Sequence, residues 1–300
     1  MPLVSIIMNC HNCSKYLPEA LDSVYQQTFK NYEIIFWDNQ STDNSAEIAL
    51  NYGEPLQYFR GDEFIPLGEA RNKAIEKSRG EYIAFLDCDD IWLPEKLEKQ
   101  VELLDSNREL GLVYSDSYFI NQNGELRKNT HFNGQKPSRG NVFNELFLSN
   151  FIPLLTVMIR KEVFNRVGVF NPEYEIAEEY DLWLRIAEYY PIDYIEQPLA
   201  KYRFHDQSTT IRNREQAFNE SFQIIEYWLN KKPSLERELR GGIKQKKAML
   251  HLSLMRYRLT CHNNRKAIGE IVHLIRLLPH SLILILKAIT KLGNLLFHRY

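Results

Sequence analysis

Residues 82–94 decide the fold of this chain, and they read Tyr82-Ile83-Ala84-Phe85-Leu86-Asp87-Cys88-Asp89-Asp90-Ile91-Trp92-Leu93-Pro94. The apolar run at the start predicts a buried strand, and the proline at the end favours the first turn of a helix. Three carboxylates then lie within four residues, where they repel one another unless a cation binds. A helix cap would need only one of the three. Because oxygen ligands suit Mg²⁺ or Mn²⁺, the segment predicts a metal site that also holds substrate phosphates.

Apolar runs alternate with amphipathic segments between the N-terminus and this cluster. We expect strands at 3–8, 32–37, 56–60 and 82–86, and helices at 18–27, 42–52, 69–77 and 95–105. This alternation predicts an α/β fold with a mostly parallel sheet flanked by helices. Ligands of such sheets bind at the carboxyl ends of the strands. Asp38-Asn39 and the acidic cluster both follow strand ends, so we expect them to share one site.

The second half of the chain has a mixed pattern. We expect strands at 112–118 and 156–159, a helix at 178–189, and a helical region from 213 to the end, broken at Pro233, Gly241-Gly242 and Pro279. The predicted organisation is therefore a nucleotide-binding domain over 1–212 and a helical C-terminal region over 213–300.

Composition and charge support this division. The chain has 300 residues, 44% hydrophobic and 25% charged, as is typical of soluble globular proteins. Residues 231–300 hold 15 Lys and Arg against 3 Asp and Glu, a net charge of +12, whereas residues 1–230 carry −14. We expect the acidic part to hold metal and nucleotide, and the basic part to meet an anionic surface or polymer.

The cysteines and the N-terminus point to a reducing cytoplasm. Four cysteines do not form a secreted disulfide framework in a chain of this length, and Met1-Pro2-Leu3 lacks the basic start of a signal peptide. Cys10-His11-Asn12-Cys13 has the Cys-x-x-Cys spacing of redox sites, but no other thioredoxin feature accompanies it. Two neighbouring cysteines would also need distant partners to hold zinc. We therefore expect neither a redox nor a zinc role.

Two further motifs allow two interpretations each when taken alone. Asp38 or Asn39 could accept the N3–H of a pyrimidine, or could form an Asx-turn that caps the next helix. Arg71 could donate two parallel hydrogen bonds to a phosphate, or could be a solvated helix residue.

Taken together, six short motifs occur in the order and spacing of family 2 glycosyltransferases. They are Val4-Ser5-Ile6-Ile7, Asp38-Asn39-Gln40-Ser41-Thr42-Asp43, Ala70-Arg71-Asn72, Phe85-Leu86-Asp87-Cys88-Asp89-Asp90, Ala177-Glu178-Glu179-Tyr180-Asp181 and Tyr202-Arg203-Phe204-His205. The chain resembles this family over residues 1–210. The resemblance implies a GT-A fold and an inverting transferase that uses a nucleotide-sugar, UDP-linked by preference, and Mn²⁺ or Mg²⁺.

The resemblance also implies roles for individual residues. Asp89 would contact the metal, with His205 either as a further ligand or as a loop histidine, and Asp90 would cap the next helix. Asn9, His11, Asp38, Asn39, Arg71 and Asp87 would bind the nucleotide. Glu178-Glu179 matches the family's acidic pair, whose second member is the catalytic base. Asp181 would support the helix start or a sugar hydroxyl.

Glu179 is the expected base because inversion needs a carboxylate on the face opposite the leaving group, where it takes the proton of the acceptor hydroxyl. The alternative is an acidic first turn favoured by the helix dipole. This chain departs from the family at His11, which replaces an aromatic, at Asn39, which replaces Asp, and at Glu179, one methylene longer than the usual Asp.

The C-terminal segment bears on the partners and the location of the protein. Residues 276–292 are mostly apolar, with basic residues at intervals. We therefore expect this segment either to lie on an anionic membrane or to pack on the catalytic domain or a second subunit. A membrane role would fit a glycan or lipid-linked acceptor at the inner face of the plasma membrane, in surface polysaccharide synthesis. We expect no nucleic acid partner.

Two other functions stay open, a nucleotidyltransferase that activates a sugar phosphate and a non-catalytic carbohydrate-binding protein on the same fold.

Overall fold

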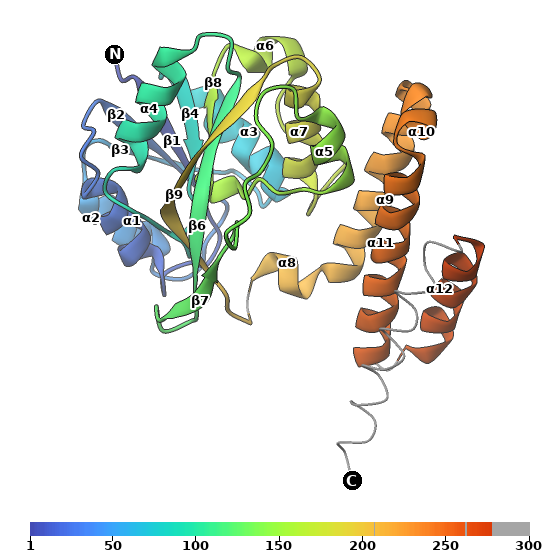
Figure 1. The fold of residues 1–300 in the computed structure, drawn as a ribbon. Coiled ribbons are helices and arrows are strands. Elements are labelled where there is room, and N and C mark those ends of the chain that lie inside the picture. The colour runs from blue at the N-terminus through green and yellow to red at the C-terminus, as the bar shows by residue number, and fades with distance from the viewer. Residues whose placement is uncertain (207, 262, 278–300) are drawn as a thin grey trace. The chain divides into compact units, whose positions relative to one another are not determined.

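A computed structural model describes residues 1–206, 208–261 and 263–277 (Figure 1). The chain forms two compact units. The first comprises Met1–Leu146 and Asn150–Ser208, and the second comprises Phe147–Ser149 and the chain from Thr209 on.

The first unit contains a nine-stranded sheet of order β3-β2-β1-β4-β8-β6-β9-β5, with β7 paired to β6. Its first four strands are β1 (Val4–Cys10), β2 (Tyr32–Asp38), β3 (Leu56–Arg60) and β4 (Tyr82–Phe85). They pair in parallel, as expected. Their side chains are almost all buried in β1, β2 and β4, because helices cover both faces of a sheet built from strand-helix-strand units.

The other half of the sheet is mixed. It consists of β5 (Ile91–Trp92), β6 (Leu112–Ile120), β7 (Leu126–Thr130), β8 (Met158–Arg160) and β9 (Ile192–Arg203). Strands β6 and β9 are parallel, whereas β8 runs antiparallel to both β4 and β6. The sequence did not predict β5 and β7, because one has only two residues and the other is largely exposed and carries no apolar alternation.

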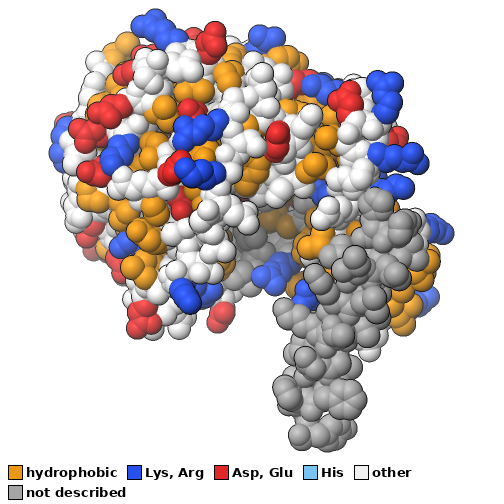
Figure 2. Space-filling model, in the orientation of Figure 1, with side chains coloured by type: hydrophobic (Ala, Val, Ile, Leu, Met, Phe, Trp, Pro, Cys, Tyr) orange, Lys and Arg blue, Asp and Glu red, His pale blue; other side chains and the backbone are white. Residues whose placement is uncertain are grey.

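Helices flank the sheet of the first unit. α1 (Leu17–Tyr25) and α4 (Lys96–Ser106) bury apolar residues in one core cluster with Val4, Ile6 and Met8 of β1. α3 (Leu67–Lys77) packs against β1 and β2. The remaining elements are α2 (Ser45–Tyr52), α5 (Phe143–Leu148), the 3₁₀ helix η1 (Leu154–Thr156), α6 (Val163–Val167) and α7 (Glu178–Ala187), and the last two residues of α5 belong to the second unit. Acidic and basic side chains are mixed over the face of the first unit that Figure 2 shows.

The second unit is helical, with α8 (Thr209–Arg212), α9 (Arg214–Lys231), α10 (Ser234–Glu238), α11 (Arg240–Thr260) and α12 (Asn264–Arg276). The expected break at Gly241-Gly242 was wrong, since α11 runs through both residues. A Cβ at Gly242 would lie 2.7 Å from the Leu148 side chain, so the glycine serves close packing within this unit. Residues 278–292 of the expected tail helix lie outside the described residues. In the described part of the chain, no helix is both long and apolar enough to cross a membrane.

Candidate functional site

The site lies at the carboxyl edge of the parallel strands. β1 has β2 on one side and β4 on the other, so Asn9-Cys10, Asp38-Asn39 and Asp87–Asp90 all follow or end strands at the same edge. The alternation of strand and helix in the sequence predicted this convergence, and it places the acidic segment and the loop that follows β2 on either side of the end of β1.

Asp89 and His205 form a direct contact between two distant motifs. The Nε2 atom of His205 lies 2.7 Å from Oδ2 of Asp89, although 116 residues separate them. The His205 side chain is 10% exposed and that of Asp89 is 31% exposed. The Arg203 guanidinium holds this arrangement, because its Nε donates to the Asp89 carbonyl at 2.8 Å. Arg203 lies within the Tyr202–His205 motif, but the motif gave it no predicted role.

Asp90 does not cap the next helix, and this expectation was wrong. Its Oδ1 accepts a 2.8 Å hydrogen bond from the backbone N–H of Arg203, and α4 begins only at Lys96. Burial, together with the charges of Asp89 and Asp87, raises the pKa of Asp90 well above its usual value. Asp90 therefore ties the acidic loop to the end of β9, which places His205 beside Asp89.

Arg71 is buried between two motifs. Its Nη2 donates to Asp87 Oδ1 at 2.9 Å and its Nη1 donates to Glu178 Oε1 at 2.5 Å. The guanidinium also lies over the Phe170 ring, 5.5 Å from its centroid. Both terminal nitrogens of the buried guanidinium donate to carboxylates. Arg71 therefore joins the first residue of α7 to the acidic loop rather than presenting an open phosphate-binding surface.

Glu179 is the half-buried neighbour of Glu178 in the first turn of α7. Burial and the Glu178 charge raise the pKa of Glu179 to about 8, against the opposing charge of Arg71. A carboxylate with a pKa near neutral holds a proton more strongly than an ordinary glutamate, which is the property of a general base.

Asp181 supports α7. Its Oδ2 accepts a 2.9 Å hydrogen bond from Nε of Arg185, one turn further along the helix. Arg185 also donates to the carbonyls of Val167 and Val169, so the pair links α7 to the segment after α6. Of the two roles expected for Asp181, these contacts favour support of the helix.

The side chains of Asp38 and Asn39 hold the loop after β2. Asp38 accepts hydrogen bonds from Ser41 N, Tyr58 OH and Arg60 Nη1. Burial acts to raise the pKa of Asp38, but these hydrogen bonds and the Arg60 charge outweigh it and leave the pKa below its usual value. Asn39 exchanges two hydrogen bonds with the backbone of Ile65. Both side chains therefore shape the loop.

His11 and Phe64 form an aromatic pair beside the loop that follows β2. Their ring centroids are 4.7 Å apart in an edge-to-face arrangement, and Phe64 is 61% exposed. Nδ1 of His11 lies 2.8 Å from the Asn39 carbonyl, which fixes the ring over this loop. The Nδ2 atom of Asn9, two residues before His11 in the chain, is buried and has no hydrogen-bond partner among the described residues. Phe64 was not predicted as a site residue, because its segment lacks a recognisable motif.

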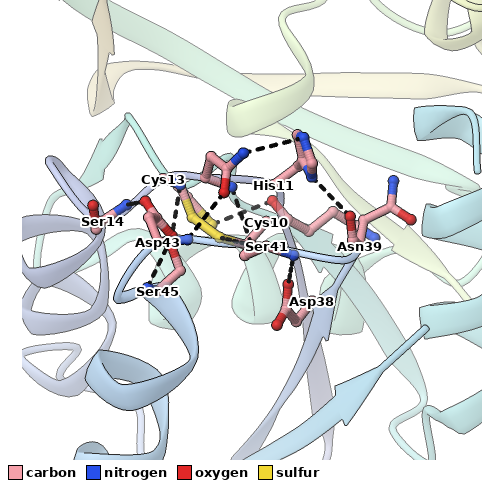
Figure 3. Close-up of a disulfide and its surroundings, with 12 residues drawn as sticks. Cys10, His11, Cys13, Ser14, Asp38, Asn39, Ser41, Asp43 and Ser45 are labelled. Carbon is pink, nitrogen blue, oxygen red and sulfur yellow. Dashed lines mark hydrogen bonds between the residues drawn. A yellow bond between two sulfur atoms is a disulfide. The ribbon is translucent and has the colours of Figure 1, made fainter. Parts of the chain in front are cut away.

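Cys10 and Cys13 form a disulfide at the start of the loop after β1 (Figure 3). This bond differs from the expectation that the Cys-x-x-Cys pair has no redox chemistry. Cys88 contributes a third sulfur, and the three sulfur atoms lie within 4.8 Å of one another. The short spacing of Cys10 and Cys13 was visible in the sequence, but the approach of Cys88 depends on the pairing of β1 with β4.

The sequence profile of glycosyl transferase family 2 matches residues 5–168, which is more than half of the chain. The chain belongs to glycosyl transferase family 2. The matched region includes β1 to β4, the Asp38 loop, Arg71 and the acidic segment.

Curated relatives agree with this assignment. The glycosyltransferase is 32% identical over 238 residues to an uncharacterised glycosyltransferase of Methanocaldococcus jannaschii, covering 77% of this chain and 81% of the relative. It spans only 37% of a longer Rickettsia felis relative that is 34% identical over 231 residues, 73% of this chain. It is also 32% identical over 187 residues to the Escherichia coli UDP-Glc:alpha-D-GlcNAc-diphosphoundecaprenol beta-1,3-glucosyltransferase WfgD, covering 62% of this chain and 70% of that protein.

Solved structures share the fold of this glycosyltransferase. The mannosyltransferase PcManGT from Pyrobaculum calidifontis, in complex with GDP-Man and Mn²⁺, superimposes with a TM-score of 0.62 at 17% identity, covering 97% of this chain and 81% of that one. TarS 1–349 of S. aureus, in complex with UDP-GlcNAc, gives a TM-score of 0.60 at 17% identity, covering 89% and 88%. The fold is therefore that of the GT-A glycosyltransferases.

Proposed function

We propose that this glycosyltransferase moves a sugar, with inversion, from a UDP-sugar to a hydroxyl of a glycan or lipid-linked acceptor, and that it uses Mn²⁺ or Mg²⁺. The observation that carries the proposal is the meeting of the Asp89–His205 pair with the Arg71 bridge at one edge of the sheet. A metal-binding pair and a base-bearing helix are thereby tied to the same acidic loop.

The donor atoms of Asp89 and His205 fit a divalent cation. A carboxylate oxygen and an imidazole nitrogen 2.7 Å apart are close enough to bind one ion, and Mn²⁺ accepts both ligand types. Asp87 is engaged by Arg71, so the protein supplies few ligands. Such a site suits a cation that also binds substrate phosphates. When bound, the cation would offset the charge that develops on the departing diphosphate.

Glu179 would be the catalytic base. It would take the proton of the acceptor hydroxyl while that oxygen attacks the anomeric carbon from the face opposite the diphosphate. Arg71 would hold Glu178, and with it the first turn of α7, in place relative to Asp87. The base and the acidic loop would then keep a constant spacing as the glycosidic bond forms.

The nucleotide would lie over the loop after β2. His11 and Phe64 would stack on the base, since exposed aromatic rings favour such contacts. The Asn9 amide would donate a hydrogen bond to the nucleotide, because its Nδ2 is buried and lacks a partner among the described residues. Asp38 and Asn39 would position this loop. The UDP preference is supported by WfgD, whose name specifies UDP-Glc, and by the UDP-GlcNAc complex of TarS.

A lipid-linked acceptor would bring the protein to the inner face of the plasma membrane, and WfgD acts on a diphosphoundecaprenol acceptor. α12 offers a surface for an anionic bilayer. Its apolar residues Ile268, Ile271, Val272 and Ile275 are each at least 40% exposed, while Ala267 and Leu274 pack with residues of α11. The acid within α12, Glu270, is buried and paired with His251 and Arg258, so the exposed charges of this helix are basic.

The test is metal-dependent release of UDP from a panel of UDP-sugars. Asp89→Asn should lower turnover with Mn²⁺ about 100-fold or more, because a lost metal contact removes several kcal/mol of transition-state stabilisation. Asp22→Asn, which changes an exposed carboxylate on α1, is the matched control and should keep wild-type turnover.

Three results would contradict the proposal. Equal turnover of wild type and Asp89→Asn would remove the metal assignment. Release of pyrophosphate from a nucleoside triphosphate and a sugar phosphate, in place of UDP release, would identify a nucleotidyltransferase. Binding of carbohydrate without any turnover would identify a non-catalytic protein.

A further inference from the structure

The Cys10–Cys13 disulfide closes a short segment that supports the nucleotide loop. Cys10 is the last residue of β1 and Cys13 precedes α1, and their Cα atoms are 5.8 Å apart. Between them lie His11 and Asn12, both exposed. Asn12 has a φ of 56°, in the left-handed region that non-glycine residues rarely adopt. The disulfide therefore tethers both ends of a segment with an uncommon backbone conformation.

This segment is hydrogen-bonded to the loop after β2 at several points (Figure 3). The Asn12 side-chain carbonyl accepts from the backbone N–H groups of Thr42 and Asp43, at 2.8 and 3.3 Å. The Asn12 N–H donates to Ser41 Oγ at 3.0 Å, and the Cys13 N–H donates to Ser45 Oγ at 3.0 Å. The loop that would hold the nucleobase thus rests on the disulfide-closed segment.

The two sulfur atoms differ in access. Cys10 is 2% exposed, whereas Cys13 is half-buried, so an external thiolate reaches Cys13 first. The buried thiol of Cys88 donates to the Asn9 carbonyl at 3.3 Å and lies close to both. Cys88 is therefore an alternative disulfide partner for Cys10, and a test must distinguish a Cys10–Cys88 pair from the Cys10–Cys13 pair.

We propose that the Cys10–Cys13 disulfide is a redox latch on the donor site, which a dithiol reductant opens with a loss of nucleotide affinity. One thiolate of the reductant attacks Cys13 Sγ, and the electron pair of the broken bond leaves with Cys10, which takes up a proton. The second thiolate of the reductant then displaces Cys13, which is also protonated. The protein gains two electrons and two protons, and the reductant becomes a disulfide.

Reduction breaks the bond between Cys10 and Cys13, so the segment between these two residues gains conformational freedom. Nucleotide binding must then order residues 11–14 and the loop after β2 that rests on them. The entropy cost of this ordering lowers the affinity for the nucleotide. The direction of the effect follows from the hydrogen bonds through Asn12 and Cys13. This inference rests on the proposed donor site, because it assumes that the nucleotide lies over the same loop.

The test compares oxidised and reduced protein by calorimetric titration with UDP, after mass spectrometry has identified the disulfide-bonded pair. Reduction should raise the Kd about three- to tenfold, the change expected when a few side chains must be ordered on binding. Cys13→Ser, measured without reductant so that the reductant cannot disturb the titration, should show the weaker Kd. Cys261→Ser removes the exposed free cysteine of the second unit and should retain the wild-type redox response.

Hydrogen exchange at residues 41–45 supplies a readout that needs no nucleotide. Exchange of the Thr42 and Asp43 amides should be faster after reduction and in Cys13→Ser. Equal exchange and equal Kd in both redox states would overturn the latch, as would oxidised protein in which Cys10 pairs with Cys88. If neither redox state binds a nucleotide while exchange still responds to reduction, the donor assignment fails and the latch remains.

Discussion

At the residue scale, the main departure from expectation concerns Arg71. The sequence motif suggested a cation for the diphosphate, but the folded chain gives both arms of its guanidinium to carboxylates, Asp87 and Glu178. Removing such a partner leaves charges buried and unpaired, which is costly. The same neighbourhood acts on Glu179, because burial and the charges of Glu178 and Asp87 raise the pKa of this carboxyl while the Arg71 charge lowers it.

The pH dependence of turnover tests Glu179. Because a base must be unprotonated to act, turnover should rise with pH through about 8, the pKa of Glu179. Glu179→Gln should lower turnover by about 10²–10⁴-fold above pH 8, since proton transfer is lost, and the difference from wild type should shrink below pH 8, where Glu179 of the wild type is itself protonated. Glu173→Gln, an exposed carboxyl outside α7, should keep the wild-type profile. A profile that stays flat between pH 6 and 9 would argue against this residue as the base.

Stability should respond to the same group with the opposite sign. The folded protein keeps Glu179 protonated up to about pH 8, whereas the unfolded chain releases this proton near the ordinary glutamate pKa. Between these two values the folded state binds more protons, so the Glu179 contribution to stability is lost as the pH rises. Thermal unfolding should show Glu179→Gln gaining in Tm over wild type from pH 5 to pH 8. A constant difference would mean that Glu179 titrates normally.

At the element scale, the parallel strands follow from local pattern, and their exact approach depends on one glycine. Gly80 precedes β4 where the chain passes β1. A Cβ placed there would lie 2.6 Å from the Ser5 backbone nitrogen and 2.8 Å from the Val4 carbonyl carbon. Because backbone atoms cannot rotate away as a long side chain can, β4 would have to shift to accept a larger residue.

Gly80→Ala should therefore destabilise the first unit, by about 1–3 kcal/mol as for other overpacked sites. Urea unfolding of the full chain measures this change. Gly269→Ala on α12 is the matched control, since nothing among the described residues lies within 4 Å of its new Cβ. The control should keep or raise stability, because alanine favours a helix. Equal effects of the two substitutions would show that the close approach at Gly80 has no energetic weight.

At the scale of the whole molecule, the main feature is the uneven distribution of charge along the chain. Residues 1–230 carry −14 and residues 231–300 carry +12. The exposed apolar side chains of α12 lie within the basic part. This combination is typical of helices that lie in the interface of an anionic bilayer, where apolar burial and charge attraction add.

Vesicle sedimentation of the full chain tests this surface. Binding should be strong to vesicles rich in phosphatidylglycerol, weak to phosphatidylcholine, and lower at high salt because the Debye length falls. The double change Ile268→Asn and Ile275→Asn should lower binding about tenfold or more, since two buried apolar side chains are lost. Leu50→Asn, at an exposed leucine of α2, should leave binding unchanged. Unchanged binding in the α12 variant, or variant-sensitive dimerisation, would contradict a lipid partner.

Local pattern was enough to establish the parallel strands, the flanking helices and the Asp87–Asp89 cluster, because apolar period and strand-end carboxylates depend on neighbours in the chain. The order of the six motifs was enough to indicate the family. Only the folded chain established that Arg71 bridges Asp87 and Glu178, that Asp90 meets Arg203, and that Phe64 stands beside His11. These contacts join residues far apart in sequence, so they depend on strand order and packing, which no local pattern encodes.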